Sequence, residues 1–547
     1  MTKNILNFNV GVLGHIDSGK TSLSITLSTV ASTASFDKNP QSQERGITID
    51  LGFSSFSVDV PDHIKIQKPE YEILQFTLVD CPGHASLIKT IIGGAQIIDL
   101  IMLVIDITKG IQTQTAECLV LGEITCNHMI VVLNKIDLLP KDKMEQSIQK
   151  MSKKILKTLE KTKFKDSVIV PVSAKPVSEE KPIGIDLLVQ TLQQFTYVPE
   201  RSEKGPFMFA VDHCFAIRGQ GAVMTGTVVQ GCITLSDSIE IPAAKIVRKV
   251  KSIQMFKKPV PKAMQGDRVG ICVTQFDPKI LERGTVCTPG YMETAETVII
   301  SVHKIPYFKS KCLSNSKFHI TIMHDTIMAK CTFFSSIKAS QNKTENVNEF
   351  DFDKDYMYMD EIPGSELPEN DDLGDIFALL QFDKPVIIGQ KSIYIASKLE
   401  TDIHANVCRL AFHGKILSVI LNKNDNECLS KLRVYKEKSR EGFVDRMAND
   451  YQVIVRDLFK KETNIQIFTN LKVVLSTGEI GVIEGSFGKS GKINVRIPNG
   501  LSSDTSAILN VKKGKKETVK EKPESIKVIL KFKKFIFDDK KKILQSL

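Results

Sequence analysis

The eight residues from Gly14 to Thr21 constrain this chain more than any other feature. They spell Gly-His-Ile-Asp-Ser-Gly-Lys-Thr, which matches the phosphate-binding pattern G-x-x-x-x-G-K-[ST]. The context gives the match its meaning, because an apolar run at residues 10–13 precedes it and a helical pattern begins at Ser22. In such a strand–loop–helix unit, backbone N–H groups and the helix N-terminus bind phosphate oxygens. The sequence therefore predicts a nucleotide site at this loop.

Six consecutive residues of the loop are expected to contact the phosphates or their metal ion. The Lys20 ammonium is expected to neutralise the outer phosphate oxygens, and the Thr21 hydroxyl is a hard oxygen ligand that suits Mg²⁺. The neighbouring backbone N–H groups complete the cradle. The predicted phosphate-binding set is Asp17, Ser18, Gly19, Lys20, Thr21 and Ser22.

Two later segments predict a metal-dependent switch. In Arg45-Gly46-Ile47-Thr48, the Thr48 hydroxyl is expected to bind Mg²⁺ when a third phosphate is present. Residues 36–50 would then be ordered by the triphosphate and released on hydrolysis. The run Asp80-Cys81-Pro82-Gly83-His84 follows an apolar strand. There Asp80 is expected to hold Mg²⁺ through a water molecule, and the Gly83 N–H to meet the terminal phosphate.

Two more segments predict the choice of base. In Asn134-Lys135-Ile136-Asp137, the Asp137 carboxylate is placed to accept two hydrogen bonds from the N–H edge of guanine, which adenine lacks. Lys135 is expected to lie along the base, and Asn134 to brace the loop. The amides of Ser173-Ala174-Lys175, after another apolar run, are expected to reach the guanine carbonyl oxygen. Because these elements follow in order, each at a strand end, we predict GTP and GDP binding with Mg²⁺.

The rest of the chain divides into several predicted domains. Its 547 residues exceed what one core supports, since single cores stop growing at about 250–300 residues. Residues 1–200 alternate buried apolar runs with helical patterns, which predicts an α/β P-loop GTPase domain built on a parallel sheet. Short strands separated by turns predict two β-barrel domains, at residues 205–291 and 294–420. Residues 426–547 are predicted to form a β-rich, basic C-terminal domain.

Composition excludes several classes of protein. The eleven cysteines include no C-x-x-C pair, which argues against a zinc site. Their odd number and the absence of a secretory signal fit a reducing compartment. No apolar run approaches the ~18 residues that a membrane helix needs. We therefore expect a cytoplasmic protein without a membrane segment.

Charge is unevenly distributed. Residues 345–375 contain twelve acidic side chains and a single lysine, and we predict that they form a flexible insertion in the second barrel. Residues 431–547 contain 26 lysines and arginines against 14 aspartates and glutamates. This excess indicates either a polyanionic partner or a solvated lysine-rich tail. The run at residues 512–516, Lys-Lys-Gly-Lys-Lys, is also compatible with nuclear import.

The motifs at Arg45–Thr48 and Asp80–His84 resemble those of translational GTPases. In that superfamily a histidine in the position of His84 orients the attacking water, so the resemblance implies that His84 is the catalytic residue. The GTPase domain followed by two barrels resembles the branch that delivers aminoacyl-tRNA. Within it, the chain is most similar to the selenocysteine-specific elongation factors of eukaryotes and archaea. This likeness fades only in the acidic insertion and the lysine-rich tail.

The resemblance also implies an aminoacyl pocket. General tRNA carriers place an apolar residue where this chain has His213, after Asp212, and an asparagine where it has Arg268. In the selenocysteine factors the matching Asp, His and Arg line the pocket. A selenol ionises more readily than a thiol of pKa ~8.5, so Arg268 and His213 would stabilise an anion. The alternative is that these residues form a structural bridge with Asp212 between strands.

Taken together, the resemblance implies a monomeric GTPase that carries selenocysteyl-tRNA to the ribosome. It would deliver this tRNA at recoded UGA codons and hydrolyse GTP on codon recognition, stimulated by the ribosome. The C-terminal domain would respond to the RNA element for selenocysteine insertion through a protein that binds that element. Two alternatives share the GTP motifs: a subunit of an initiator-tRNA factor, and a ribosome-associated GTPase without aminoacyl cargo.

Overall fold

In the computed structural model the chain forms two compact units. The first comprises Met1–Thr332, Glu361–Pro368 and Ala378–Lys423, and the second comprises Phe333–Asp360, Glu369–Phe377 and Asn424–Leu547. The structure describes residues 4–28, 30–31, 52–81, 98–177, 181–219, 221–256, 258–337, 350–364, 373–389, 391–400, 408–420, 426–488, 491–511, 525–538 and 543–545. No helix within these ranges is long and apolar enough to cross a membrane.

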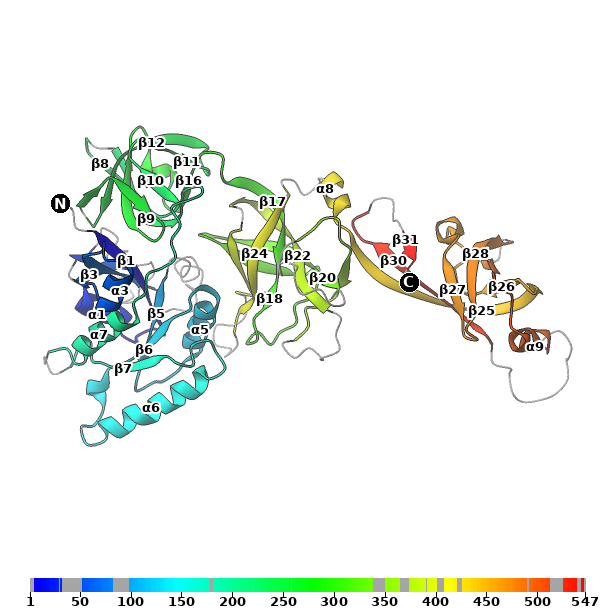
Figure 1. Cartoon of the computed structure of the whole chain (residues 1–547), viewed down its shortest axis with the longest axis horizontal. Coiled ribbons are helices and arrows are strands. Elements are labelled where there is room, and N and C mark those ends of the chain that lie inside the picture. Colours follow the sequence, from blue (N-terminus) through cyan, green and yellow to red (C-terminus); the bar gives the residue numbers. More distant parts are fainter. Residues whose placement is uncertain are drawn as a thin grey trace. The chain divides into compact units, whose positions relative to one another are not determined.

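The first domain is a seven-stranded sheet in the order β2-β3-β4-β1-β5-β6-β7 (Figure 1). The central strands are parallel and buried along almost their whole length, because helices cover both faces. The strands are β1 (Ile5–Gly14), β2 (Val30–Ala31), β3 (Gly52–Asp59), β4 (Ile73–Asp80), β5 (Leu100–Asp106), β6 (Met129–Asn134) and β7 (Val168–Pro171). The helices are α1 (Lys20–Leu27), α3 (Asp62–Gln67), α5 (Thr113–Thr125), the 3₁₀ helix η2 (Ile136–Leu138), α6 (Met144–Leu159) and α7 (Ile185–Phe195).

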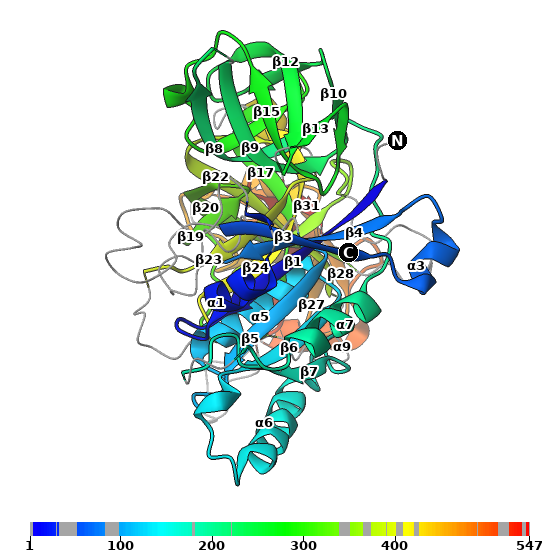
Figure 2. The same ribbon diagram turned by 90° about the vertical axis from the view of Figure 1, so that its left-hand side faces the viewer.

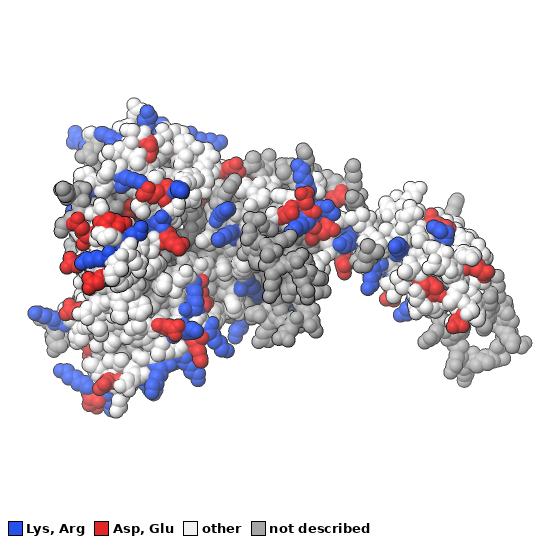
Figure 3. Space-filling model, viewed as in Figure 1, with Lys and Arg blue, Asp and Glu red and all other residues white. Residues whose placement is uncertain are grey.

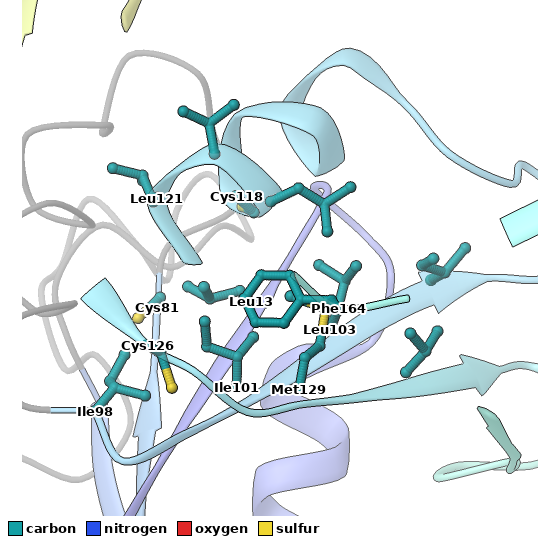
Figure 4. Packing of buried hydrophobic residues seen from close by; sticks show 14 of the residues in the cluster. Leu13, Cys81, Ile98, Ile101, Leu103, Cys118, Leu121, Cys126, Met129 and Phe164 are labelled. Carbon is teal, nitrogen blue, oxygen red and sulfur yellow. The ribbon is translucent and has the colours of Figure 1, made fainter. Parts of the chain in front are cut away.

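Two hydrophobic clusters hold the helices to the sheet. Leucines of α1 and α7 pack on one face with side chains of β1 and β4. On the other face, α5 and α6 pack with Leu13, Leu103 and Phe164. Figure 4 shows part of this cluster, with Leu13, Leu103 and Phe164 near Cys118 and Leu121 of α5. Helix α6 is amphipathic, and its lysines lie along the lower edge in Figure 3. Because parallel strands end together, the predicted nucleotide motifs lie at one edge of this sheet.

The second domain is a closed barrel (Figure 2). Its strands pair in the order β11-β16-β8-β9-β15-β12, and β12 pairs back to β11. Closure leaves no free edge among these strands. The elements are β8 (Met208–Ile217), β9 (Gly221–Gln230), β10 (Cys232–Thr234), β11 (Ser238–Ile241), β12 (Ile246–Met255), β13 (Lys258–Val260), β14 (Lys262–Met264), β15 (Arg268–Val273), η3 (Pro278–Ile280) and β16 (Gly284–Cys287).

The third domain is also a barrel, in which strands pair in the order β19-β23-β24-β17-β22-β20 and β20 pairs back to β19. Its core is continuous with that of the first domain, since Ile305, Ile395 and Leu410 belong to the cluster beneath α5. The strands are β17 (Glu293–Ser301), β18 (His303–Lys304), β19 (Lys317–Ile322), β20 (Asp325–Ile337), β22 (Leu373–Ile388), β23 (Ile393–Ser397) and β24 (Leu410–Ile420).

The second unit is β-rich, in the strand order β21-β25-β26-β29-β28-β27-β30-β31, with β25 also paired to β30. Apart from β21, these strands contribute side chains to one apolar core, which also includes Leu509 of α9. Its elements are β21 (Tyr356–Met359), α8 (Asn426–Lys431), β25 (Val434–Asn449), β26 (Gln452–Arg456), η4 (Ile465–Phe468), β27 (Lys472–Leu475), β28 (Ile480–Phe487), β29 (Lys492–Arg496), α9 (Ser503–Val511), β30 (Lys527–Phe535) and β31 (Ile543–Gln545).

The acidic stretch differs from the sequence expectation of a flexible insertion. Residues 350–364 are ordered and contain β21, and β22 begins at Leu373. Phe350 stacks on Tyr356 at 5.0 Å between ring centroids, and both rings contact Phe377. Aromatic burial therefore fixes a segment whose charge alone disfavours packing. Residues 345–349 and 365–372 lie outside the described residues.

Pairing with basic side chains of the same unit offsets the charge of this stretch. Asp355 lies 2.8 Å from the Arg433 guanidinium and 3.6 Å from the Lys533 ammonium. Asp360 lies 3.3 Å from the ammonium of Lys436. Two carboxylates of the acidic stretch and three cations of the basic excess thus neutralise one another in part.

Candidate functional site

The phosphate loop joins β1 to α1 and has the backbone that a phosphate cradle needs. Asp17 and Gly19 both adopt positive φ, at 59° and 88°. A Cβ at Gly19 would lie 2.2 Å from the side-chain nitrogen of Asn134, so only glycine fits there. The same nitrogen donates to the Ser18 carbonyl at 2.9 Å. Asn134 therefore connects the phosphate loop to the segment predicted to read the base.

The residues predicted to neutralise phosphate charge or to bind Mg²⁺ lie close together at this loop. The Lys20 Nζ donates to the His15 carbonyl at 2.8 Å, and the side chain is buried. Burial lowers the pKa of Lys20, and the nearby Asp80 carboxylate opposes this shift. The Thr21 hydroxyl donates to Asp80 Oδ2 at 2.7 Å. A hydroxyl and a carboxylate in contact are hard oxygen donors, so this pair fits the predicted Mg²⁺.

The segments predicted to bind guanine are preassembled. The Ser173 hydroxyl donates to Asp137 Oδ1 at 2.5 Å, and the Ala174 N–H donates to Asn134 Oδ1 at 3.2 Å. Lys135 adopts a positive φ of 66°, and its ammonium lies 2.8 Å from Asp106 Oδ2. These contacts fix the ends of β5, β6 and β7 relative to one another. Lys175 follows them and is exposed.

Asp106 was missed by the sequence analysis. It ends β5, and its carboxylate fixes the lysine that is expected to lie along the base. Hydrogen bonds from Lys135 and Thr108 lower the pKa of Asp106 from its ordinary value, although burial, the largest single influence, acts in the opposite direction. Its position at the end of a parallel strand, where the other nucleotide motifs also occur, was the available signal.

The Asp137→Asn substitution is expected to weaken GTP binding by about 100-fold or more, because two charge-assisted hydrogen bonds to guanine are lost. The asparagine can still accept from Ser173, so the fold should be kept. Titration with a fluorescent GDP analogue measures the change. Asp142→Asn, which alters an exposed carboxylate on the neighbouring loop, is the matched control. Equal affinity in the Asp137 variant and the wild type would place the base-reading group elsewhere.

Three predicted residues lie outside the described residues: Thr48, Gly83 and His84. Their roles as metal ligand, phosphate contact and catalytic residue stay predictions.

The predicted aminoacyl residues come together on the second barrel. The β8–β9 register shifts between Val211 and His213, which makes Asp212 the extra residue of a β-bulge. Asp212 Oδ2 accepts from the Arg268 Nη1 at 2.5 Å, and Arg268 is only 4% exposed. Burial lowers the pKa of Arg268, and the Asp212 carboxylate opposes this shift. His213 follows on the same strand and is half-buried.

The Arg268 guanidinium has two further features. Its Cζ lies 3.2 Å from the ring centroid of Phe53, at the start of β3. Its Nη2 is buried, and no acceptor within the described part of the chain forms a hydrogen bond with it. The bridge between Asp212 and Arg268 is therefore present, and it uses the guanidinium nitrogen Nη1. The N–H donors of Nη2 suit an anion.

Comparisons with known proteins agree with this architecture. Four family models match: the elongation factor Tu GTP-binding domain (residues 5–198), elongation factor Tu domain 2 (221–288), the third domain of the eukaryotic selenocysteine-specific elongation factor (299–414), and the eEFSec C-terminal RIFT domain (430–541). These ranges lie within the four predicted segments.

Solved structures support the same fold. SelB from Methanococcus maripaludis, in complex with the GTP analogue GppNHp, aligns over 100% of both chains at a TM-score of 0.67 and 24% identity. A bacterial selenocysteine-specific elongation factor aligns at a TM-score of 0.56 and 21% identity, over 79% of this chain and 60% of its own.

Sequence relatives are more similar. The selenocysteine-specific elongation factor of Mus musculus is 52% identical, and the alignment covers 99% of both proteins. The factor of that name from Methanocaldococcus jannaschii is 30% identical over 89% of this chain and 93% of its own length. With full-length identity at this level, the chain belongs to the selenocysteine-specific elongation factors.

Proposed function

We propose that this protein is a GTP-hydrolysing elongation factor that binds selenocysteyl-tRNA and delivers it to cytoplasmic ribosomes at recoded UGA codons. The observation that carries the proposal is the buried Arg268, whose Nη1 is held by Asp212 and whose buried Nη2 has no hydrogen-bond partner among the described residues. A buried cation with an unused donor is costly unless an acceptor is supplied. An anionic aminoacyl group would supply this hydrogen-bond acceptor.

The GTP-binding domain would determine when the tRNA is delivered, because it hydrolyses GTP. Lys20, which contacts the His15 carbonyl in this structure, would turn to the outer phosphates, and Thr21 and Asp80, which share a hydrogen bond, would hold the metal ion. When bound, Mg²⁺ neutralises charge on the phosphate oxygens. The proposed role of His84 is to orient the water that attacks the terminal phosphate in line, on the ribosome.

The pocket is proposed to select the aminoacyl group of the cargo. A selenolate accepts charge-assisted hydrogen bonds from Arg268, and His213 beside Asp212 adds a second donor or a cation. A seryl group offers a neutral hydroxyl and leaves the guanidinium poorly paired. The difference is on the order of 2–3 kcal/mol, or roughly 30–150-fold in binding. The basic second unit is proposed to meet the RNA element through the protein that binds it.

Protection of the aminoacyl ester tests the proposal. Selenocysteyl-tRNA and seryl-tRNA are incubated with saturating GTP and wild-type protein or Arg268→Ala, and the rate of ester hydrolysis is followed. The wild type is expected to protect the selenocysteyl ester roughly 100-fold better than the seryl ester, and the variant to lose this preference. Equal protection of both esters by the wild type would indicate a general tRNA carrier. Protection of neither would refute aminoacyl cargo.

A further inference from the structure

The turn that carries Arg268 is fastened to the GTP-binding domain and not only to its own barrel. We infer that Asn7, Asn9 and Phe53 of the GTP-binding domain are positioning residues for Arg268, so that cargo selectivity is set by two domains. The inference rests on the proposed role of Arg268 as the group that reads the cargo.

The first contact is an amide clamp two residues before Arg268. The Gly266 carbonyl accepts from Asn7 Nδ2 at 2.8 Å and from Asn9 Nδ2 at 2.9 Å. Both asparagines lie in β1 and are buried, with exposed fractions of 4% and 1%. The Thr77 hydroxyl, on β4, donates to Asn7 Oδ1 at 2.7 Å and orients that amide. Two buried donors on one carbonyl fix its direction firmly.

The clamp admits only glycine at its centre. Gly266 has a φ of 88°, and a Cβ there would lie 2.2 Å from the Cζ of Arg201. The Arg201 guanidinium lies against this glycine and pairs with Asp99 Oδ2 at 2.5 Å. Asp99 Oδ2 also accepts from the Asn9 N–H at 2.8 Å. The turn is therefore enclosed by side chains of the GTP-binding domain and of the linker that follows it.

The second contact is the ring stack at Phe53. This ring is fully buried, and the guanidinium carbon lies 3.2 Å from its centroid. An aromatic face attracts a cation but accepts no conventional hydrogen bond, so the stack fixes the guanidinium plane and leaves its N–H edge available. Phe53 pairs with Val79, next to the predicted metal ligand Asp80.

Each of these contacts constrains a different part of Arg268. Asp212 holds one nitrogen of Arg268, the Phe53 ring holds its plane, and the clamp holds its backbone. Discrimination between an anion and a hydroxyl depends on where the charge lies, so loosening the plane or the backbone should reduce selectivity. The binding of GTP itself uses other residues and should be unaffected.

The test compares Phe53→Leu and the double variant Asn7→Ala/Asn9→Ala with two matched controls. Phe56→Leu removes another buried ring of β3, which stacks on Phe76 and not on Arg268. Gln265→Ala alters the same turn but removes a bond to the Ser202 N–H. The measured quantity is the ratio of selenocysteyl to seryl ester protection at saturating GTP. Fluorescent GDP affinity and the midpoint of thermal unfolding are measured in parallel.

The Phe53 and double-asparagine variants are expected to lower the selectivity ratio about tenfold while GDP affinity stays within about twofold. Both controls should keep the wild-type ratio, even though Phe56→Leu lowers the thermal midpoint. Unchanged ratios in the test variants, with selectivity abolished by Arg268→Ala, would overturn the positioning inference and leave the proposed function standing. An unaltered ratio in Arg268→Ala would instead remove the proposed function. Equal loss in Phe53→Leu and Phe56→Leu would reduce the effect to general destabilisation and overturn the inference.

Discussion

Replacing Arg409 with alanine is expected to lower the free energy of unfolding of the first unit by about 3–5 kcal/mol. The Arg409 guanidinium binds Glu117 of α5 through two bonds, Nε to Oε1 at 2.9 Å and Nη2 to Oε2 at 2.8 Å. The two side chains are 5% and 7% exposed. Removing the arginine leaves a buried carboxylate without its counter-charge, between the first domain and the third.

Urea denaturation, monitored by hydrogen exchange in α5 and β24, measures this loss of unfolding free energy. The double variant Glu117→Gln/Arg409→Met is the informative control, because replacing a buried ion pair by groups of similar volume is often close to neutral. It should recover most of the stability. Stability close to wild type in Arg409→Ala would mean that water reaches Glu117 and that the pair contributes little.

The Lys20→Ala substitution is expected to reduce GTP hydrolysis by roughly 10³-fold and to weaken GTP binding strongly. Lys20 is the buried cation beneath the phosphate loop, and preorganised charge is worth most where water is excluded. Because the hydrogen bond that the Lys20 ammonium makes within the described residues is to a backbone carbonyl, its loss should leave the loop itself folded.

Two measurements separate these effects. Phosphate release gives the rate, and the rise in thermal midpoint on adding Mg²⁺ and GTP reports binding, since a ligand at 100 times its Kd stabilises by about 2.7 kcal/mol. Lys157→Ala on the exposed side of α6 is the control and should respond like the wild type. A full thermal response in Lys20→Ala would show that the backbone cradle binds the nucleotide alone.

The parts of the site that the sequence predicted are those built from contiguous residues. The phosphate loop and the segments predicted to read guanine depend on local backbone conformation, such as the positive φ at Gly19, so a short motif specifies that conformation. The four-domain organisation was readable for a similar reason, since a change from helical patterns to short strands is a local property of the chain. The full-length similarity to selenocysteine-specific factors also makes a subunit of an initiator-tRNA factor a poorer description than the one proposed.

Contacts between distant residues were not predictable. Arg409 and Glu117 are 292 positions apart, and neither lies in a recognisable pattern. The stack of Arg268 on Phe53 likewise depends on how a barrel lies against a sheet, which no local propensity specifies. The expectation that the acidic stretch is flexible differed from the structure for another reason. The packing of this stretch depends on Phe350 and Tyr356, which are too few to give a periodic signal.

The pairing of Asp355 and Asp360 with basic side chains of the second unit, to which they belong, has a consequence for how this region responds to ionic strength. A polyanion gains affinity by releasing its condensed counterions to solution, one for each protein cation that takes their place. Arg433, Lys436 and Lys533 are already occupied by Asp355 and Asp360 of the same unit. They can displace fewer counterions than free cations would, so the logarithmic slope of affinity against salt should be shallower than the basic excess of residues 431–547 suggests.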